Sequence, residues 1–288
     1  GMRRILATMG PPAHHRPIAL VASVAQVSDF ADQVPVFAQK LIDAFWPGPL
    51  TLILPRRAGV AEAAAGGHAT IGLRCPAHPV AQALLAACAA RGVRGLAAPS
   101  ANRFGRISPT TAQHVAQEFG DELLVLDGGP CAVGIESTIV DCTRGAPVLR
   151  RPGQLARADI ERVAGQHLLS KEELLAPDPQ APGTLLAHYA PRAKLRLMDA
   201  RELRAALDML GADAKNIAVW ARAPLRSASR ALLLRRMPDD AATVAQQLLA
   251  VLRGFDDAGV KLIWVEAPPP EPAWDGVRDR LQRAAASA

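Results

Sequence analysis

The sequence predicts an α/β protein with two domains and a proline-rich linker between them. In its first half, short strand-like runs lie close together among segments with helical apolar spacing, which is typical of a mixed sheet with helices. In the last third, strand-like and helix-like segments alternate, which favours a small layered domain. Between them, prolines crowd residues 170–191, too densely for one regular element. We therefore predict a first domain over 1–168, a linker over 169–193 and a second domain over 194–288.

The first predicted elements are a helix and two strands. Apolar residues recur at helical spacing over 34–45, and the Trp-Pro-Gly-Pro sequence at 46–49 ends that helix. The apolar run at 50–54 is predicted to form a short buried strand. The run at 70–74 is predicted to form another strand, which Pro76 ends.

Helices and strands then alternate. Residues 78–90 are predicted to form a helix, and 95–98 a strand. A proline opens the helix predicted over 109–119, because proline is favoured in a first helical turn. Residues 123–126 are predicted to form a strand, which the turn-forming Asp-Gly-Gly-Pro sequence at 127–130 ends.

The first domain is predicted to end with strands at 137–142 and 147–150, which alternate like a pair, and a short helix at 158–164. The second domain is predicted to contain strands at 195–197, 217–220, 231–234 and 262–265, and helices at 202–210, 240–255 and 274–285.

Composition limits the class of protein. Half of the residues are hydrophobic and 21% are charged, as in a globular protein. No apolar run is long enough to span a membrane, and the first residues lack the plan of a signal peptide. The four cysteines form no CxxC pair, so a zinc site or redox motif is not expected, and they are typical of a reducing compartment. We therefore predict a cytoplasmic protein with no membrane partner.

The charge is positive. The net charge is +6 and the pI is about 9.6, mostly from arginine. Such a balance suits phosphate-bearing partners such as nucleotides or RNA. The alternative is that the arginines are spread over a solvated surface, since no dense run of lysine and arginine occurs.

A small-residue segment near position 100 is a candidate phosphate-binding loop. A predicted strand ends in a tight loop that carries Ser100, Asn102 and Ser108 just before a helix N-terminus. Hydroxyls, backbone N–H groups and the helix dipole together favour a phosphate at such a place. Ordinary helix capping by serine and threonine is the alternative explanation.

Two more segments carry charged groups beside turns. Glu136 and Asp141 flank an apolar run, where a carboxylate is able to hold Mg²⁺ or orient a substrate amine. Arg151 follows a predicted strand and precedes Pro152-Gly153, a good position for a forked pair with phosphate. The alternatives are a turn with polar ends and a surface arginine.

In order and spacing, these segments resemble the YrdC-type threonylcarbamoyl-AMP synthase family. The matching sequences are FWPGPLTL at 45–52, TIGLRCP at 70–76, PSAN at 99–102, GIESTIVD at 134–141 and RRPG at 150–153. Pro182-Gly183, followed by His-Tyr-Ala-Pro at 188–191, and Asp-Arg-Leu at 279–281 resemble the long, two-domain form. The resemblance implies a twisted mixed sheet in the first domain and a smaller Rossmann-like α/β domain after the linker.

The resemblance also implies a reaction. In the family, L-threonine and bicarbonate form a carbamate that attacks the α-phosphate of ATP, giving threonylcarbamoyl-adenylate and pyrophosphate with the help of Mg²⁺. The adenylate serves N6-threonylcarbamoyladenosine modification of tRNA, so tRNA and tRNA-modification proteins are candidate partners. Such catalysis depends mainly on positioning and charge neutralisation, and no residue is assigned a catalytic role.

The family motifs imply which residues bind the substrates. The implied ATP-binding residues are Thr70, Ser100, Ser108, Arg151 and Tyr189. The implied L-threonine-binding residues are Arg74, Ala98 through its backbone, and Ser137. Asn102 and Glu136 are implied to support them, and no metal ligand is assigned. Arg74 suits the threonine carboxylate because a guanidinium and a carboxylate form a bidentate pair.

The residues before Phe45 depart from the family pattern. No PTETVYGLG-like loop, which completes the threonine pocket in the family, is found. Met9 and Pro11 stand where the family has the lysine and arginine that face the phosphates, and Val21 stands where it has a histidine. A hydrogen bond to a charged group contributes roughly 1.5–3 kcal/mol, so we expect weak or absent activity, lower by about three or four decades. A missing first strand is also expected to expose a sheet edge.

Two hypotheses follow. The first is a threonylcarbamoyl-adenylate synthase, in a shortened or mis-started copy or a degenerate paralogue. The second is a nucleotide- or RNA-binding relic, which the replaced lysine and arginine favour. Retention of Arg74, Ser100, Ser137 and Arg151 favours the first. The second domain shows no phosphate loop or catalytic cluster, so a regulatory or scaffolding part is expected, and the linker is a candidate lid.

Overall fold

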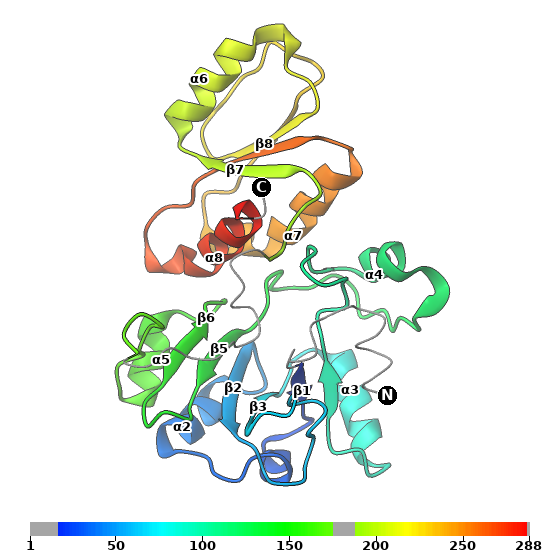
Figure 1. The fold of residues 1–288 in the computed structure, drawn as a ribbon, viewed down its shortest axis with the longest axis vertical. Coiled ribbons are helices and arrows are strands. Elements are labelled where there is room, and N and C mark those ends of the chain that lie inside the picture. The colour runs from blue at the N-terminus through cyan, green and yellow to red at the C-terminus, as the bar shows by residue number, and fades with distance from the viewer. Residues whose placement is uncertain (1–16, 175–187, 287–288) are drawn as a thin grey trace. The chain divides into compact units, whose positions relative to one another are not determined.

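The computed structural model describes residues 17–174 and 188–286 and divides the chain into two compact units (Figure 1). The first unit comprises 1–104, 118–129 and 136–184, and the second comprises 105–117, 130–135 and 185–288. Met9, Pro11, Pro182-Gly183 and most of the candidate lid lie outside the described residues. The predicted domain boundaries at 168 and 194 stay predictions.

The first unit contains a six-stranded mixed sheet with the order β4-β1-β3-β2-β5-β6 (Figure 1). The strands are β1 (Ile18–Leu20), β2 (Leu50–Pro55), β3 (Thr70–Arg74), β4 (Leu96–Ala98), β5 (Thr138–Asp141) and β6 (Val148–Arg151). β1 runs parallel to β3, and β2 runs parallel to β5, whereas the other three neighbouring pairs are antiparallel. The predicted mixed sheet is therefore confirmed, as is the antiparallel pair formed by β5 and β6.

One face of this sheet is buried in the core of the first unit. Alternate residues of β2 and β3, among them Leu52 and Leu73, are fully buried. They pack with the helices α2 (Val36–Phe45) and α5 (Arg157–Ala164), which also contact each other. Because side chains alternate along a strand, the intervening residues must point to the opposite face. Thr70 and Arg74, two of the predicted substrate-binding residues, are on that opposite face.

The helices predicted at 78–90 and 109–119 form α3 (Pro79–Ala89) and α4 (Ala112–Phe119), each within a few residues of its predicted bounds. The strand predicted at 123–126 is wrong. Leu124 is fully exposed and Leu126 is 63% exposed, and the segment has no neighbouring strand. A strand needs a partner for its backbone hydrogen bonds, and an apolar run without one does not become a strand.

The apolar run at 18–20, which was not predicted to be a strand, forms β1. It lies between β3 and β4, with Leu20 paired to Arg74 on one side and to Leu96 on the other. β3 is therefore an interior strand, and the edges of the sheet are β4 and β6. A 3-10 helix at Val24–Asp29 follows β1 and contributes Val27 to the core.

The second unit contains a four-stranded parallel sheet with the order β7-β10-β8-β9. Its strands are β7 (Lys194–Met198), β8 (Ile217–Ala221), β9 (Leu233–Arg236) and β10 (Leu262–Glu266), and its helices are α6 (Ala200–Leu210), α7 (Ala241–Asp257) and α8 (Asp275–Ala285). α6 packs on one face, while α7 and α8 pack on the other (Figure 1). The predicted α/β layered domain is confirmed, although β9 lies two residues beyond its predicted position.

Candidate active site

Thr70 and Arg74 lie on the same face of the first-unit sheet, at the two ends of β3. Gly72 lies between them on that face, while Ile71 and Leu73 are buried in the core on the other. The half-buried Thr70, Gly72 and Arg74 thus form one row along the strand. A row with a hydroxyl at one end and a guanidinium at the other offers hydrogen-bond donors to an elongated polar ligand.

Ala98 belongs to the same face. It pairs directly with Ile18 across β1 and β4, and directly paired residues point to the same side of a sheet. The Ile18 side chain in turn lies 3.8 Å from the position that a Cβ on Gly72 would occupy. The Thr51 methyl group lies 3.6 Å from the same position, so this face extends from β4 across β1 and β3 to β2.

Ser137, Thr51 and Arg151 form a buried polar cluster at the next strands along this face. The Thr51 and Ser137 hydroxyl oxygens are 2.7 Å apart. Arg151 donates through Nε to the Ser137 carbonyl at 3.0 Å and through a terminal nitrogen to the Ser137 hydroxyl at 3.2 Å. These contacts use two of the five guanidinium N–H groups, and the others form no hydrogen bond within the described parts of the chain. A buried cation with unused donors is suited to an anionic ligand.

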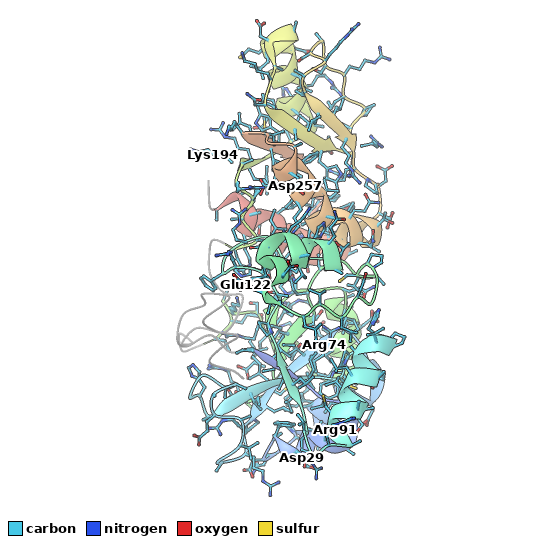
Figure 2. The ribbon with its side chains drawn as sticks, turned by 90° about the vertical axis from the view of Figure 1, so that its right-hand side faces the viewer. Asp29, Arg74, Arg91, Glu122, Lys194 and Asp257 are labelled. Atoms are coloured by element: carbon cyan, nitrogen blue, oxygen red, sulfur yellow. The ribbon has the colours of Figure 1, made fainter. Side chains whose placement is uncertain are left out.

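The turn before β2 brings Arg74 and Ser137 to the same end of the sheet. Arg74 Nε donates to the Gly48 carbonyl at 2.9 Å, and Gly48 N donates to the Cys75 carbonyl at 2.8 Å. Thr138 N donates to the Pro49 carbonyl at 2.9 Å, which anchors the residue after Ser137 to the same turn. Figure 2 labels Arg74 in the first unit. A cation and a hydroxyl are thereby held near one another by backbone contacts.

Glycine is required where the RRPG turn meets the GIEST segment. A Cβ on Gly153 would lie 2.5 Å from Thr138 N and 2.9 Å from the Glu136 carbonyl oxygen, closer than real side chains come. Glu136 itself is half-buried beside Ser137. The close approach therefore joins two of the three segments on which the site was predicted.

The loop after β4 has strained backbone at its centre. Ala101 adopts a φ of +55°, which is uncommon for a residue with a side chain and occurs most often at functional sites. Ser100 is exposed, and Asn102 is 5% exposed and donates through Nδ2 to the Arg103 carbonyl at 2.8 Å. Asn102 thus forms a hydrogen bond within the loop, and its supporting role stays a prediction.

The other two predicted ATP-binding residues, Ser108 and Tyr189, are described in the second unit. Ser108 is 4% exposed, and Tyr189 is fully buried with a φ of +59°. The Arg280 guanidinium lies 5.3 Å from the centre of the Tyr189 ring, and the His188 ring meets that ring edge-on at 4.1 Å. Tyr189 therefore packs against side chains of the second unit.

Asp141 has a structural role in the described chain. Its carboxylate accepts the Thr143 N–H at 3.0 Å and the Thr143 hydroxyl at 2.7 Å, and it forms an ion pair with Arg144 at 3.4 Å. Those contacts complete the turn between β5 and β6. No group of three or more His, Cys, Asp or Glu side chains in 17–174 or 188–286 is placed to hold a metal ion.

Val21, which stands where the family has a histidine, is buried in the core directly after β1. Its backbone N–H donates to the Arg74 carbonyl at 2.9 Å. Its side chain belongs to the helix-covered face, so it adds no polar group to the face that carries Arg74.

Sequence reasoning missed Thr51 and the turn glycines Gly48 and Gly153. A signal for Thr51 was present, because it is the one hydroxyl in the apolar run LTLIL. A polar side chain in a fully buried strand requires a partner, and Ser137 supplies it. Gly48 gives no such signal, since the clash of a Cβ with the Phe45 carbonyl at 2.2 Å depends on the folded turn.

Two family models together match nearly the whole chain. The Sua5/YciO/YrdC model, described as telomere recombination, matches residues 1–153. A second model, described as the C-terminal domain of threonylcarbamoyl-AMP synthase, matches residues 155–286. The fold and the polar sheet face thus belong to a class of proteins in which a YrdC-like domain precedes this second domain.

Curated relatives and a solved structure narrow the class. Threonylcarbamoyl-AMP synthase of Pyrococcus abyssi is 33% identical to this chain, over 98% of this chain and 84% of its own length. Threonylcarbamoyl-AMP synthase of Bacillus subtilis is 32% identical, over 99% of this chain and 83% of its own length. The crystal structure of P. abyssi Sua5 complexed with L-threonine matches with a TM-score of 0.87 at 32% identity, covering 98% of this chain and 84% of that one. The chain belongs to the threonylcarbamoyl-AMP synthase family.

Proposed function

We propose that this chain joins L-threonine, bicarbonate and ATP to give threonylcarbamoyl-AMP and pyrophosphate. The observation that carries the proposal is the row of polar groups on one sheet face, from Thr70 and Arg74 to the buried Ser137–Arg151 pair. An adenylate-forming reaction on this face needs cations for a carboxylate and for phosphates, and the two arginines supply them. The family relationship to threonine-bound Sua5 supports the choice of amino acid.

The proposed roles are those that the family motifs imply, and the chemistry of the charged and hydroxyl side chains suits them. Arg74 pairs with the threonine carboxylate, with Ser137 and the Ala98 backbone beside it. Arg151 uses its remaining N–H groups on the ATP phosphates, and it is held in place by Ser137. The proposed further ATP contacts come from Thr70, Ser100, Ser108 and Tyr189, with Asn102 and Glu136 in support.

The arrangement performs chemistry by positioning. The carbamate, which forms from threonine and bicarbonate with release of water, is the nucleophile, and pyrophosphate leaves from the α-phosphate as the new bond forms. Fixed cations stabilise the negative charge that develops on the phosphate oxygens, without any covalent link to the protein. Catalysis of this kind requires no nucleophilic side chain.

In this proposal, Mg²⁺ binds together with ATP. The described residues offer no carboxylate cage, and Mg²⁺ typically binds through phosphates and water with one or two carboxylates. The half-buried Glu136, next to Ser137, is the carboxylate proposed to face it. When bound, the ion supplies charge neutralisation at the phosphates.

The cellular setting is also a proposal. The product suits tRNA modification, and a net charge of +6 suits work near RNA. We place the protein in the cytoplasm for that reason. No helix in the described parts of the chain is long and apolar enough to cross a membrane.

The alternative, a nucleotide- or RNA-binding relic, is less favoured. The relatives that this chain matches over nearly its whole length are named threonylcarbamoyl-AMP synthases, which supports the synthase. The deciding assay measures pyrophosphate release with ATP, L-threonine and bicarbonate, beside the P. abyssi relative as reference. Release that requires both threonine and bicarbonate supports the synthase. ATP binding without any threonine-dependent release would refute the synthase and support the relic.

A further inference from the structure

Asp256, at the end of α7, binds a backbone segment of the second unit. Its carboxylate is 4% exposed and accepts the Arg192 N–H at 2.8 and 2.9 Å and the Ala193 N–H at 3.1 Å. It also forms ion pairs with Arg106 at 3.5 Å and Arg192 at 3.7 Å. A buried carboxylate with this many partners fixes the geometry of everything bound to it.

The position of Asp256 is unfavourable for the helix itself. A negative charge in the last turn opposes the helix dipole, and α7 has no basic residue in that turn. Asp256 therefore does not stabilise α7 as an isolated helix. Its favourable contacts all lie outside α7, in residues 106 and 192–193.

Those outside contacts belong to two segments that are paired with each other. Ala190 N donates to the Gly105 carbonyl at 2.9 Å, and Arg106 and Ala190 form a parallel bridge. Arg253, one turn before Asp256, donates to the carbonyls of Ile107 and Ser108. The end of α7 thus contacts both the segment that contains Ser108 and the segment that directly follows Tyr189.

Tyr189 needs support of this kind. It is a non-glycine residue with a left-handed φ of +59°, and such a conformation persists only where the surroundings impose it. Its ring is fully buried under the Arg280 guanidinium. The backbone that follows it is held at Ala190 by Gly105 and at 192–193 by Asp256.

We propose that Asp256 is a positioning residue for ATP, because it fixes together the two segments that carry Ser108 and Tyr189. The inference rests on the proposed ATP contacts of those two residues. It gives the second unit a part in the proposed reaction, because α7 holds the segments that carry Ser108 and Tyr189.

The test is calorimetry of ATP and of L-threonine, measured separately, with Asp256→Asn. Asparagine keeps the shape and one acceptor oxygen but removes the charge. We expect ATP affinity to fall roughly tenfold or more, with threonine affinity unchanged because Arg74 and Ser137 lie in the first unit. The matched control is Asp257→Asn, labelled in Figure 2, a 53% exposed neighbour whose substitution removes the same charge. This control should bind both ligands as the unmodified protein does.

Arg253→Met provides a second variant. It keeps the apolar stem and loses the hydrogen bonds to Ile107 and Ser108, so it should show the same selective loss of ATP affinity. Unchanged ATP affinity in both variants would overturn the inference, as would an equal loss of ATP and threonine affinity. Pyrophosphate release by the unmodified protein is measured alongside. Its absence would count against the proposed synthase, whereas the binding comparison tests Asp256 without depending on turnover.

Discussion

At the scale of single residues, Ser137 is both a buried hydrogen-bonding group and a proposed threonine contact. Its hydroxyl contacts Thr51 and Arg151, and its carbonyl accepts a second bond from Arg151. Ser137→Ala should raise the KM for L-threonine roughly tenfold and lower the free energy of unfolding by about 1–3 kcal/mol, because a buried guanidinium loses a partner. Steady-state kinetics and denaturant unfolding check the two effects.

Thr51→Val is the matched control for Ser137. It breaks the same buried hydrogen bond between Thr51 and Ser137 but removes no proposed substrate contact. It should therefore lower the free energy of unfolding by about 1 kcal/mol and leave the KM values for ATP and L-threonine unchanged. A rise in the KM for threonine as large as that of Ser137→Ala would show that the kinetic effect comes from packing.

The replaced cations of the N-terminal segment give a gain-of-function prediction. Met9 and Pro11 are predicted, from the order of the motifs, to stand where the family has a lysine and an arginine. The double substitution Met9→Lys with Pro11→Arg should raise kcat/KM for ATP, by about two decades or more if both side chains reach phosphates. Pyrophosphate release measures the change. A double variant no faster than the unmodified protein would contradict the expected cost of the two replacements.

At the scale of elements, Gly134 marks a close approach of a loop to α7. A Cβ at this position would lie 2.3 Å from the Cα and carbonyl oxygen of Gln246, and the backbone φ is +80°. Gly134→Ala should lower the free energy of unfolding by more than the roughly 1–2 kcal/mol that a left-handed alanine costs alone. Gly129→Ala is the control, since Gly129 has a φ of +84° with open space around it. Equal losses in denaturant unfolding would show that the contact with α7 is unimportant.

His114 makes the start of α4 sensitive to pH. Its Nδ1 accepts the Thr110 N–H at 3.2 Å, and burial, aided by Arg253 and opposed by Asp257, holds its pKa below the usual value of 6.5. The unfolded chain therefore binds the proton more readily. The resulting stability is complete above about pH 6.5 and is lost as the pH falls through the lower folded pKa.

His114→Asn tests this sensitivity. Asparagine retains an acceptor near the Nδ1 position and does not titrate, so its melting temperature should fall less between pH 7 and pH 5 than that of the unmodified protein. Glu173 and Glu161 raise the pKa of His167, so His167 contributes to the pH dependence of stability with the opposite sign. Both proteins contain His167, so its contribution cancels when their melting temperatures are compared. Parallel melting curves for the two proteins would refute the assignment to His114.

The elements that the sequence predicted best are those whose pattern is local. β3 matches its predicted bounds, and its row of Thr70, Gly72 and Arg74 follows from strand alternation alone. The failure at 123–126 and the missed β1 have one physical cause. Whether a short apolar run becomes a strand depends on a neighbour that is distant in sequence, as Leu20 depends on Arg74.

The candidate site was predictable in part for the same reason. The family motifs predicted Arg74, Ser137 and Arg151 as site residues, and the structure adds the hydrogen bonds from Arg151 to Ser137. Nothing in the local sequence shows that Ser108 packs with α7, because the hydrogen bond from Arg253 spans 145 residues.

At the scale of the whole molecule, the chain passes between the two units five times. Residues 105–117 and 130–135 belong to the second unit, and Ile107 and Ile135 are buried in its core. A fragment of residues 1–168 should therefore lose partners for both isoleucines and be cleaved early within these segments under limited proteolysis. Mass spectrometry of the fragments measures the cleavage sites.

Co-production of residues 169–288 with the fragment should restore protection of those segments. The interleaved arrangement would be contradicted by a 1–168 fragment that resists cleavage there as well as the full chain does.

The position of the Ser108 segment against α7 has a consequence for the order of synthesis. Arg253 leaves the ribosome 145 residues after Ser108, which at about 5–20 residues per second is a delay of roughly 7–29 s. During that interval the nascent chain already carries Arg74 and Arg151 but lacks the helix that holds Ser108. A chain whose translation stops before α7 therefore contains every proposed first-unit contact but lacks the helix that contacts the Ser108 segment.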